Sequence, residues 1–379
     1  MENLRLIELF AGYGSQAMAL KKVGIPFEHY KVIEFDKYAI KSYNAVHGTD
    51  FKTTDIRDIS AKDLDIVDTD KYTYFLTYSF PCTDLSTAGK MEGMSKGSGT
   101  RSGLLWEVER ILKECKELPQ FLLMENVPQV HGKKNINDFA DWISFLDGLG
   151  YISKWKDLNA KDYGVAQNRE RCFMVSYLDK KLNFKFPSPF ALDKTVKDYL
   201  EDNVSDIYYM SEQGVKRLVK AEKSCHGPNY IENREISPTI DTRVGGGGNY
   251  CPYIKVRQAT KKGYIEAYPG DYVNLQFPES LTRRGRVTSD YANTLLCNDM
   301  QGVVTDDLRI RKLTPLECFR LMDVTDEDAK KILKVNSNSQ CYKQAGNSIV
   351  VSVMAEIFKN LFLGGSEQLR GQMDIYDIL

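Results

Sequence analysis

The chain has 379 residues, of which 42% are hydrophobic and 27% are charged. These values are typical of a globular protein with one large domain or two, and they exclude collagenous, coiled-coil and mainly disordered classes. The 51 Lys and Arg residues nearly balance the 52 Asp and Glu residues, so a site for a polyanion must be a local patch.

The N-terminal residues and the cysteines indicate a cytoplasmic protein. The first ten residues lack the basic start and apolar stretch of a signal peptide, and no apolar run is long enough to span a membrane. The eight cysteines include no Cys-x-x-Cys pair, so we expect reduced thiols. The four histidines lie far apart, and none belongs to a His-Glu-x-x-His motif, so the sequence predicts no metal site.

Short apolar runs alternate with amphipathic stretches over the first half of the chain. This alternation is typical of a doubly wound α/β domain with a mostly parallel sheet. Ligands of such sheets bind at the carboxyl ends of the strands, so the residues that follow each strand are candidates for a site. We predict strands at 4–10, 31–34, 74–78, 120–124 and 171–177, and helices at 16–23, 104–118 and 136–149.

The sequence changes character after this part. Phe186-Pro-Ser-Pro-Phe190 marks a break, and a helical pattern resumes near Arg311. Within the irregular segment between them, residues 211–290 hold 13 Lys and Arg against 9 Asp and Glu. We predict helices at 313–322 and 348–362, the second of which begins at a Gly-Asn-Ser cap. Its apolar face either closes a small second domain or returns to the first sheet.

A glycine-containing turn, Phe10-Ala-Gly-Tyr-Gly14, follows the first predicted strand. Such a turn lets a cofactor approach the backbone closely, although it occurs about as often for structural reasons. Glu34 ends the next strand, where an acidic residue suits ribose hydroxyls, and Asp55 lies a further strand length on. The alternative for either carboxylate is a helix cap or a solvated surface.

Two further strands end in reactive groups. Cys82 follows a predicted central strand, with Pro81 fixing the backbone before it and a polar segment, 83–103, that predicts a long loop beside the thiol. A nucleophilic cysteine needs a lowered pKa or a nearby base; an inert core cysteine is the alternative. Glu125 ends the next strand, and a carboxylate there is costly to bury unless it is paired or protonated.

Arginines that follow later in the chain are candidate partners for this carboxylate. Arg169 and Arg171 lie in the segment Gln167-Asn-Arg-Glu-Arg, directly before a predicted strand. Taken alone, this segment is more typical of a surface charge cluster.

Five motifs, in this order, resemble those of the DNA cytosine-5 methyltransferases, including their bacterial and phage modification enzymes. The resemblance covers about residues 4–178 and 309–362. The motifs are Phe-Ala-Gly-x-Gly at 10–14, Pro-Cys at 81–82, Glu-Asn-Val at 125–127, Gln-x-Arg-x-Arg at 167–171 and Gln-x-Gly-Asn-Ser at 344–348.

The resemblance implies a domain organisation. Residues 1–186 and 311–379 would form a Rossmann-like, S-adenosylmethionine-dependent methyltransferase domain, with the C-terminal helix returning to the sheet. Residues 187–310 would form a smaller, irregular and β-containing target-recognition domain.

The resemblance also implies an activity: methyl transfer from S-adenosylmethionine to carbon 5 of a cytosine flipped out of a specific double-stranded DNA sequence. Cys82 matches the thiolate that attacks carbon 6, and Glu125 matches the carboxyl that contacts ring nitrogen 3 and the exocyclic amine. Arg169 and Arg171 match the pair that holds the base oxygen, the carboxylate and nearby backbone. The base that removes the carbon-5 proton is not identified, and water is one candidate.

The resemblance further implies residues that bind the cofactor and DNA. The loop 83–103, with Ser86, would close over the flipped base, and Thr294-Leu295 matches a Thr-Leu pair of the recognition domain, with Thr239-Ile240 as a competing match. Arg283, Arg284 and Arg286 would reach phosphates or guanine edges. The implied cofactor residues are Phe10, Gly12, Gly14, Glu34, Asp55, Ile56, Pro81, Asn347 and Ser348.

Three residues depart from the usual pattern of these enzymes. Ser15 stands where another glycine is common, Thr83 replaces a glutamine after Pro-Cys, and Ala166 replaces a proline. None of these changes removes a reactive group. The short Thr83 side chain leaves open how the gap left by a flipped base is filled.

Two rival functions remain. An RNA methyltransferase acting on transfer RNA is disfavoured by the long recognition segment, and a catalytically silent DNA-binding protein is disfavoured by the intact Cys82, Glu125 and Arg171. The expected partner is double-stranded DNA at the bacterial nucleoid, bound by a monomer. Whether a cognate restriction endonuclease acts separately in a restriction-modification system stays open.

Overall fold

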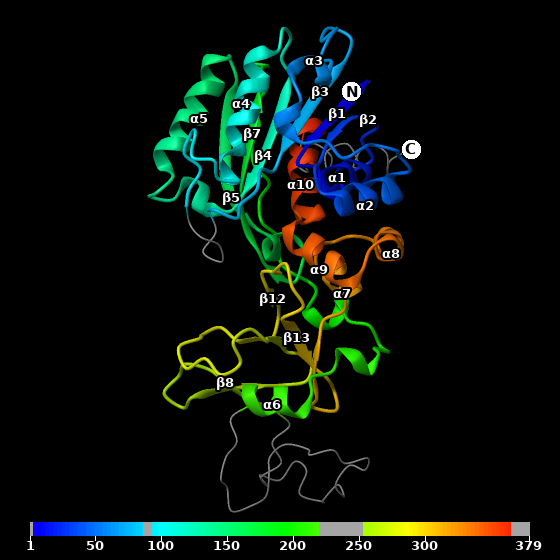
Figure 1. The fold of residues 1–379 in the computed structure, drawn as a ribbon, viewed down its shortest axis with the longest axis vertical. Coiled ribbons are helices and arrows are strands. Elements are labelled where there is room, and N and C mark those ends of the chain that lie inside the picture. The colour runs from blue at the N-terminus through cyan, green and yellow to red at the C-terminus, as the bar shows by residue number, and fades with distance from the viewer. Residues whose placement is uncertain (1–2, 86–91, 220–252, 365–379) are drawn as a thin grey trace, which may run out of the picture.

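The computed structural model describes residues 3–85, 92–219 and 253–364. Figure 1 shows a large domain built around one sheet and a small domain at the other end of the long axis, with α7, α8 and α9 between them. Ser86 and Thr239-Ile240 lie outside the described residues. Within the described part of the chain, no helix is both long and apolar enough to cross a membrane.

The large domain contains a six-stranded sheet in the order β2-β1-β3-β4-β7-β5. The first four of these strands run parallel, whereas β7 is antiparallel to both β4 and β5. The strands are β1 (Leu4–Leu9), β2 (Glu28–Ile33), β3 (Thr73–Tyr78), β4 (Phe121–Asn126), β5 (Ile152–Asn159) and β7 (Glu170–Tyr177).

Helices cover both faces of this sheet because its strands are apolar on both sides. In β4, Leu123 joins the core on one face, and Leu122 and Met124 join the core on the other. The helices of the large domain are α1 (Ser15–Lys22), α2 (Lys37–His47), α3 (Ala61–Leu64), α4 (Leu105–Glu114), α5 (Ile136–Gly148) and α10 (Val351–Phe362). The fold is therefore a doubly wound, Rossmann-like α/β domain, as expected.

The C-terminal helix α10 lies against the sheet formed by the N-terminal half of the chain (Figure 1). The ring of Phe358 packs edge-on against Phe75 of β3, with 5.2 Å between centroids, and Phe362 packs on Phe121 at the same distance. Both ends of the chain therefore build one core, and the irregular segment is inserted between them.

The described residues of the small domain form short strands and the α-helix α6. Its four-stranded antiparallel sheet has the order β11-β10-β13-β14. A two-stranded parallel ladder joins β12 to β6, so the small domain is hydrogen-bonded to the segment before β7. The elements are β10 (Tyr272–Asn274), β11 (Val287–Thr288), β13 (Gln301–Val304), β14 (Ile310–Lys312), the hairpin β8 (Ile254–Arg257) and β9 (Tyr264–Ala267), β12 (Ala292–Asn293), β6 (Gln167–Asn168) and α6 (Glu212–Leu218).

The late helices differ from the sequence prediction. The sequence predicts a helix that begins at Gly346-Asn-Ser, but Asn347 ends α9 (Asn338–Asn347), and α10 begins only at Val351. The motif is therefore a connection between two helices, which frees its backbone for contacts elsewhere. The predicted helix at 313–322 is the shorter α7 (Pro315–Arg320), followed by α8 (Asp326–Val335), which the sequence analysis missed along with α2 and β5.

A buried ion pair fixes the return from the small domain to α7. Arg311 in β14 donates two hydrogen bonds, of 2.8 and 2.7 Å, to the Glu317 carboxylate, and both side chains are buried. Glu317 also accepts from the backbone N–H groups of Thr314 and Glu201, each at 2.8 Å. The burial of both charges is tolerated because each carboxylate oxygen has two donors.

We predict that Glu317→Ala destabilises the protein by about 3–5 kcal/mol, because it leaves Arg311 buried without its counter-charge. Denaturant unfolding would measure the loss. The matched control is Glu327→Ala, since the Glu327 side chain is 81% exposed and pairs only at the surface with Lys331. Similar losses in the two variants would contradict the assignment.

Candidate active site

Cys82 lies just beyond the carboxyl end of β3, in a segment whose backbone is held by two buried side chains. Ser102 Oγ donates to the carbonyl of Pro81 at 2.7 Å, and Asn126 Nδ2 donates to the carbonyl of Phe80 at 2.9 Å. The thiol is half-buried and free. The backbone just before Cys82 is therefore held by contacts from β4 and from the far end of the 83–103 loop.

Glu125 and Arg171 form an ion pair beside this thiol. Arg171 Nε lies 3.3 Å from Glu125 Oε1, and the two side chains are only 14% and 9% exposed. The pair forms because β7 runs antiparallel to β4, which places the start of β7 at the carboxyl end of β4. A parallel β7 would have put Arg171 at the opposite edge of the sheet.

The thiol and the carboxyl are both shifted toward their neutral forms. Burial raises the pKa of Cys82 above its ordinary value and Glu125 adds to that rise, whereas Arg171 and Arg169 lower it. Burial also raises the pKa of Glu125, against the opposing effects of Arg171, Arg169 and a hydrogen bond from Ser79. Burial thus favours the neutral form of each group, and the two guanidinium groups favour the charged form.

Arg169 binds backbone carbonyls, whereas Arg171 pairs with the Glu125 carboxylate. It is 3% exposed, and its Nη2 donates to the carbonyls of Gly346 at 2.9 Å and Ser348 at 2.5 Å. Its Nη1 donates to the carbonyl of Leu295 at 3.3 Å. Burial, with the nearby charge of Arg171, lowers the pKa of Arg169 to about 9. Arg169 thus connects the small domain to the late motif, residues 344–348. It lies two residues before Arg171 of the ion pair.

The glycine-containing turn after β1 faces the end of β2. Glu34 is 9% exposed, and its carboxylate accepts hydrogen bonds from the N–H groups of Gly12 at 3.0 Å and Asp36 at 2.8 Å. Burial raises the pKa of Glu34. Phe10, whose φ is 59°, donates its N–H to the carbonyl of Ile33. The turn and the acidic residue predicted from the sequence therefore form one structural unit.

Gly14 has no room for a side chain, because a Cβ there would lie 2.3 Å from His47 Nε2. Its φ of 83° also requires glycine, and it caps α1. The next residue, Ser15, shares a hydrogen bond of 2.6 Å with Ser348. The serine that replaces a common glycine thus links the first motif to the last.

The remaining cofactor candidates lie around this unit. Asp55 caps the short helix Ile56–Asp58 and pairs with Arg57 at 2.6 Å, so its carboxylate is already engaged, while Ile56 is buried on the same face as Leu9. Pro81 is half-buried beside Cys82. Asn347 is exposed and accepts a hydrogen bond from Cys297 of the small domain.

A close backbone approach explains the glycine of the late motif. A Cβ at Gly346 would lie 2.4 Å from the carbonyl carbon and oxygen of Leu296 and 2.6 Å from the nitrogen of Cys297. The small domain therefore packs against the backbone of the motif itself.

The three candidate DNA-binding arginines differ in what they contact. Arg284 is exposed, and Arg283 is half-buried with its guanidinium 5.9 Å from the centroid of the Phe277 ring. The prediction for Arg286 is wrong in this structure: it is completely buried, and it donates to the carbonyls of Asn274, Gln276 and Phe277, each at 2.9 Å. Its charge holds the β10–β11 loop from inside and is not presented to DNA.

Thr294 and Leu295 also face inward. Thr294 Oγ1 donates to the carbonyl of Asn168 at 2.7 Å, and the Leu295 N–H donates to Gln167 Oε1 at 3.1 Å. Leu295 is 2% exposed, so its predicted contact with DNA is wrong in this structure. The pair joins the small domain to the segment that carries Arg169.

Sequence reasoning missed several residues that shape the site. Asp84 and Ser102 are buried and hydrogen-bond to each other at both ends of the loop. Phe277 and Leu281 are 71% and 82% exposed in the β10–β11 loop. The large apolar residues Phe277 and Leu281, within an otherwise polar segment, were the available signal.

We predict opposite shifts in thiol reactivity when the two charges of the ion pair are removed separately. Arg171→Gln should move alkylation of Cys82 to higher pH, because it removes a charge that lowers the thiol pKa. Glu125→Gln should move it to lower pH, because it removes a charge that raises that pKa. Peptide mass spectrometry after iodoacetamide treatment would measure both, with Cys115 as internal reference. Shifts of the same sign would indicate a loosened pocket instead.

We predict that Gly346→Ala costs about 1–3 kcal/mol of stability, because the new methyl group collides with backbone that has no rotamer to change. The control is Gly148→Ala at the end of α5, where a Cβ would meet nothing within 4 Å. That change should be neutral or stabilise by about 0.4–1 kcal/mol. A tolerated Gly346→Ala would show that the small domain does not rest on this motif in solution.

Comparison with known proteins places the chain among DNA-modifying enzymes. The family model for C-5 cytosine-specific DNA methylases matches residues 4–363. The type II methyltransferase M2.ScrFI of Lactococcus lactis subsp. cremoris is 31% identical, and the match covers 95% of this chain and 99% of that protein. The orphan methyltransferase M.SPBetaI of Bacillus phage SPbeta is 29% identical, covering 95% and 98%.

Solved structures share the fold. The Entamoeba histolytica methyltransferase EhMeth superposes with a TM-score of 0.64 at 14% identity, covering 96% of this chain and 99% of that one. The S. pombe Dnmt2 methyltransferase superposes with a TM-score of 0.56 at 21% identity and the same coverage. With a family match over nearly its whole length, the chain belongs to the C-5 cytosine-specific DNA methylases and is a DNA cytosine-5 methyltransferase.

Proposed function

We propose that the chain transfers a methyl group from S-adenosylmethionine to carbon 5 of a cytosine flipped out of a specific double-stranded DNA sequence, through a covalent adduct with Cys82. The observation that carries this proposal is the grouping of a half-buried thiol with the Glu125–Arg171 ion pair at one edge of the sheet. A base inside a stacked duplex cannot reach such a recessed group, so the target must leave the stack.

In the proposed reaction, the thiolate of Cys82 adds to carbon 6 of the ring. Glu125, whose pKa is raised by burial, donates its proton to ring nitrogen 3 as negative charge develops there. Arg171 orients the carboxyl and contacts the base oxygen. After methylation, a base removes the carbon-5 proton, the sulfur leaves by elimination, and the proton on ring nitrogen 3 returns to Glu125.

The residues at the ends of β1 and β2 fit S-adenosylmethionine. A Cβ at Gly12 would meet nothing within 4 Å, so this part of the turn is open to a ligand. Each Glu34 oxygen accepts one backbone hydrogen bond and keeps a lone pair for a ribose hydroxyl. The cofactor supplies the electrophilic methyl group when bound.

We propose the following division of the other cofactor residues. Phe10 and Ile56 contact the adenine, and Asp55 acts mainly by capping the turn that carries Ile56. Gly14, Pro81, Asn347 and Ser348 lie along the methionine part of the ligand.

The loop between β10 and β11, residues 275–286, is the candidate for recognition of the DNA sequence. Arg283 and Arg284 would contact phosphates or guanine edges, and the exposed Phe277 and Leu281 would approach the bases. Buried Arg286 holds the loop in shape. The relatives include both type II and orphan enzymes, so a restriction endonuclease of the same specificity would act as a separate protein where one exists.

We predict that Cys82→Ala abolishes methyl transfer, by on the order of 10⁴-fold or more, because the nucleophile is lost. Affinity for S-adenosylmethionine, measured by calorimetry, should stay unchanged. The assay is base-resolution bisulfite sequencing of unmethylated DNA and transfer RNA incubated with protein and cofactor. Protected cytosines in one repeated DNA context support the proposal and give the recognition sequence.

Other outcomes of this assay would overturn parts of the proposal. Protection of transfer RNA alone would move the substrate to RNA. Substantial turnover by Cys82→Ala would refute the covalent mechanism. Complete conversion of every cytosine in DNA of diverse sequence would leave a silent binding protein.

A further inference from the structure

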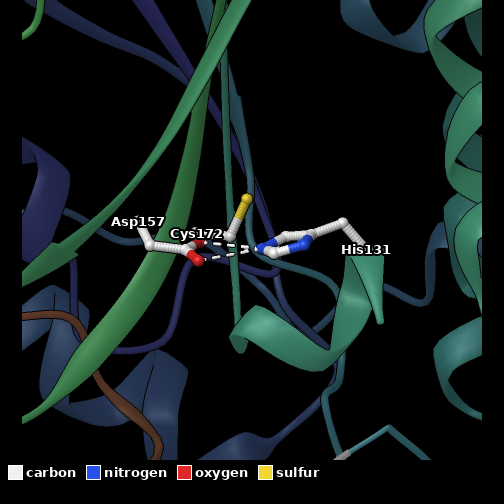
Figure 2. A group of neighbouring side chains, drawn as sticks. All are labelled: His131, Asp157 and Cys172. Atoms are coloured by element: carbon white, nitrogen blue, oxygen red, sulfur yellow. Dashed lines mark hydrogen bonds and ion pairs between the residues drawn. The ribbon is translucent and has the colours of Figure 1, made fainter. Parts of the chain in front are cut away.

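Three side chains with different metal-binding atoms meet on the α5 side of the sheet (Figure 2). His131 Nε2 lies 3.0 and 2.9 Å from the two carboxylate oxygens of Asp157, and the buried thiol of Cys172 lies beside the same carboxylate. The three ligand atoms all lie within 4.8 Å of one another. They belong to three elements: the short helix η3 (Pro128–His131), β5 and β7.

The backbone fixes this arrangement. Asp157 and Cys172 are directly opposite in the antiparallel β5–β7 ladder, so their side chains share one face of the sheet. Trp155, two residues before Asp157 in β5, stacks on the imidazole of His131 with 4.6 Å between centroids and a 35° tilt. Phe139 of α5 packs against the rings of both His131 and Trp155. The imidazole is therefore held with Nε2 toward the carboxylate.

The position of the group favours entry of an ion. Cys172 is fully buried, whereas the side chains of His131 and Asp157 are 22% and 28% exposed. An ion can therefore arrive from solvent, bind the outer two residues and reach the sulfur. The exposed side leaves room for a water as fourth ligand.

We propose that His131, Asp157 and Cys172 form a zinc site with one open coordination position. Nitrogen, oxygen and sulfur together are a zinc ligand set; calcium and magnesium prefer oxygen alone. Binding replaces the thiol proton, which goes to solvent, and the imidazole of His131 carries its proton on Nδ1 so that Nε2 is free for the metal. One thiolate and one carboxylate then neutralise the two charges of Zn²⁺. Zinc–ligand distances of about 2.0–2.3 Å place tetrahedral ligands about 3.3–3.8 Å apart. The contact between His131 and Asp157 would therefore open slightly, and the widest separation in the group, which is at most 4.8 Å, would shorten.

A zinc ion here would cross-link η3, β5 and β7 close to the proposed catalytic site. Cys172 follows Arg171 in β7 and is paired with Asn126, the residue after Glu125. By the alternation of a strand, Arg171 and Cys172 point to opposite faces. The ion would therefore brace the strands that carry the ion pair without touching the substrate. This role is independent of the proposed methyl transfer.

The test uses the full chain, stripped of metal with a chelator and titrated with Zn²⁺ against a chromophoric competitor. We expect one equivalent per chain and a higher Tm with zinc. Titration with Co²⁺ should give visible bands of a four-coordinate ion together with a thiolate-to-cobalt charge-transfer band. Cys172→Ala should remove that band, and His131→Ala should lower affinity at least tenfold. The control Cys115→Ala, which removes a half-buried thiol elsewhere, should leave the titration unchanged.

Several results would overturn the site. These are less than a tenth of an equivalent of tightly bound zinc, a cobalt spectrum without the thiolate band, or a titration that Cys172→Ala does not alter. Should Cys172→Ala fail to fold, Asp157→Asn keeps the shape of the side chain and removes its charge. Unchanged affinity in that variant would equally exclude the site.

Discussion

The antiparallel pairing of β7 with β4 is the constraint on which the site depends. It opposes Glu125 to Phe173 and Asn126 to Cys172, so the residue just before Cys172 in β7 lies beside the end of β4. Arg171 thereby meets the Glu125 carboxylate at 3.3 Å. Without this partner, a carboxylate whose side chain is 9% exposed would carry the full cost of desolvation. The reversal of a single strand thus makes a buried carboxyl compatible with a stable sheet.

The same segment also holds the two domains together. Gln167 bonds to the Leu295 N–H and to the Leu321 carbonyl, and Arg169 bonds to three backbone carbonyls of the small domain and the late motif. A planar guanidinium can direct several N–H groups at once, which an ammonium cannot do in this fixed geometry. Arg171 therefore pairs with the Glu125 carboxylate, and Arg169, two residues earlier, holds the contact between the two domains.

The sequence was informative where local pattern and reactive residue types coincide. The alternation of apolar runs predicted β1, β2, β3, β4 and β7 and the residues at their ends, because burial on both faces leaves a clear hydrophobic signature. The direction of β7 could not be predicted, since a strand reads the same in either direction. The burial of Arg286 was also hidden, because its partners are backbone carbonyls that have no sequence signature. The His131–Asp157–Cys172 group is brought together by the register of β5 and β7. Its residues lie far apart in the sequence, so they form no motif with a short spacing.

The charges around Cys82 suggest why its thiol would lose its proton more easily once a cytosine base is bound. In the free protein, burial and the Glu125 carboxylate raise the pKa of Cys82, and the two arginines lower it. In the proposed complex, a hydrogen bond to ring nitrogen 3 would stabilise the protonated form of Glu125, which takes its proton from solvent. The nearby charge that opposes thiolate formation is then lost, while both guanidinium charges remain. The sulfur then loses its proton more easily at the moment when carbon 6 is within reach. Activation would thus follow from the substrate's own hydrogen bond to Glu125, and the site would need no dedicated base beside the sulfur.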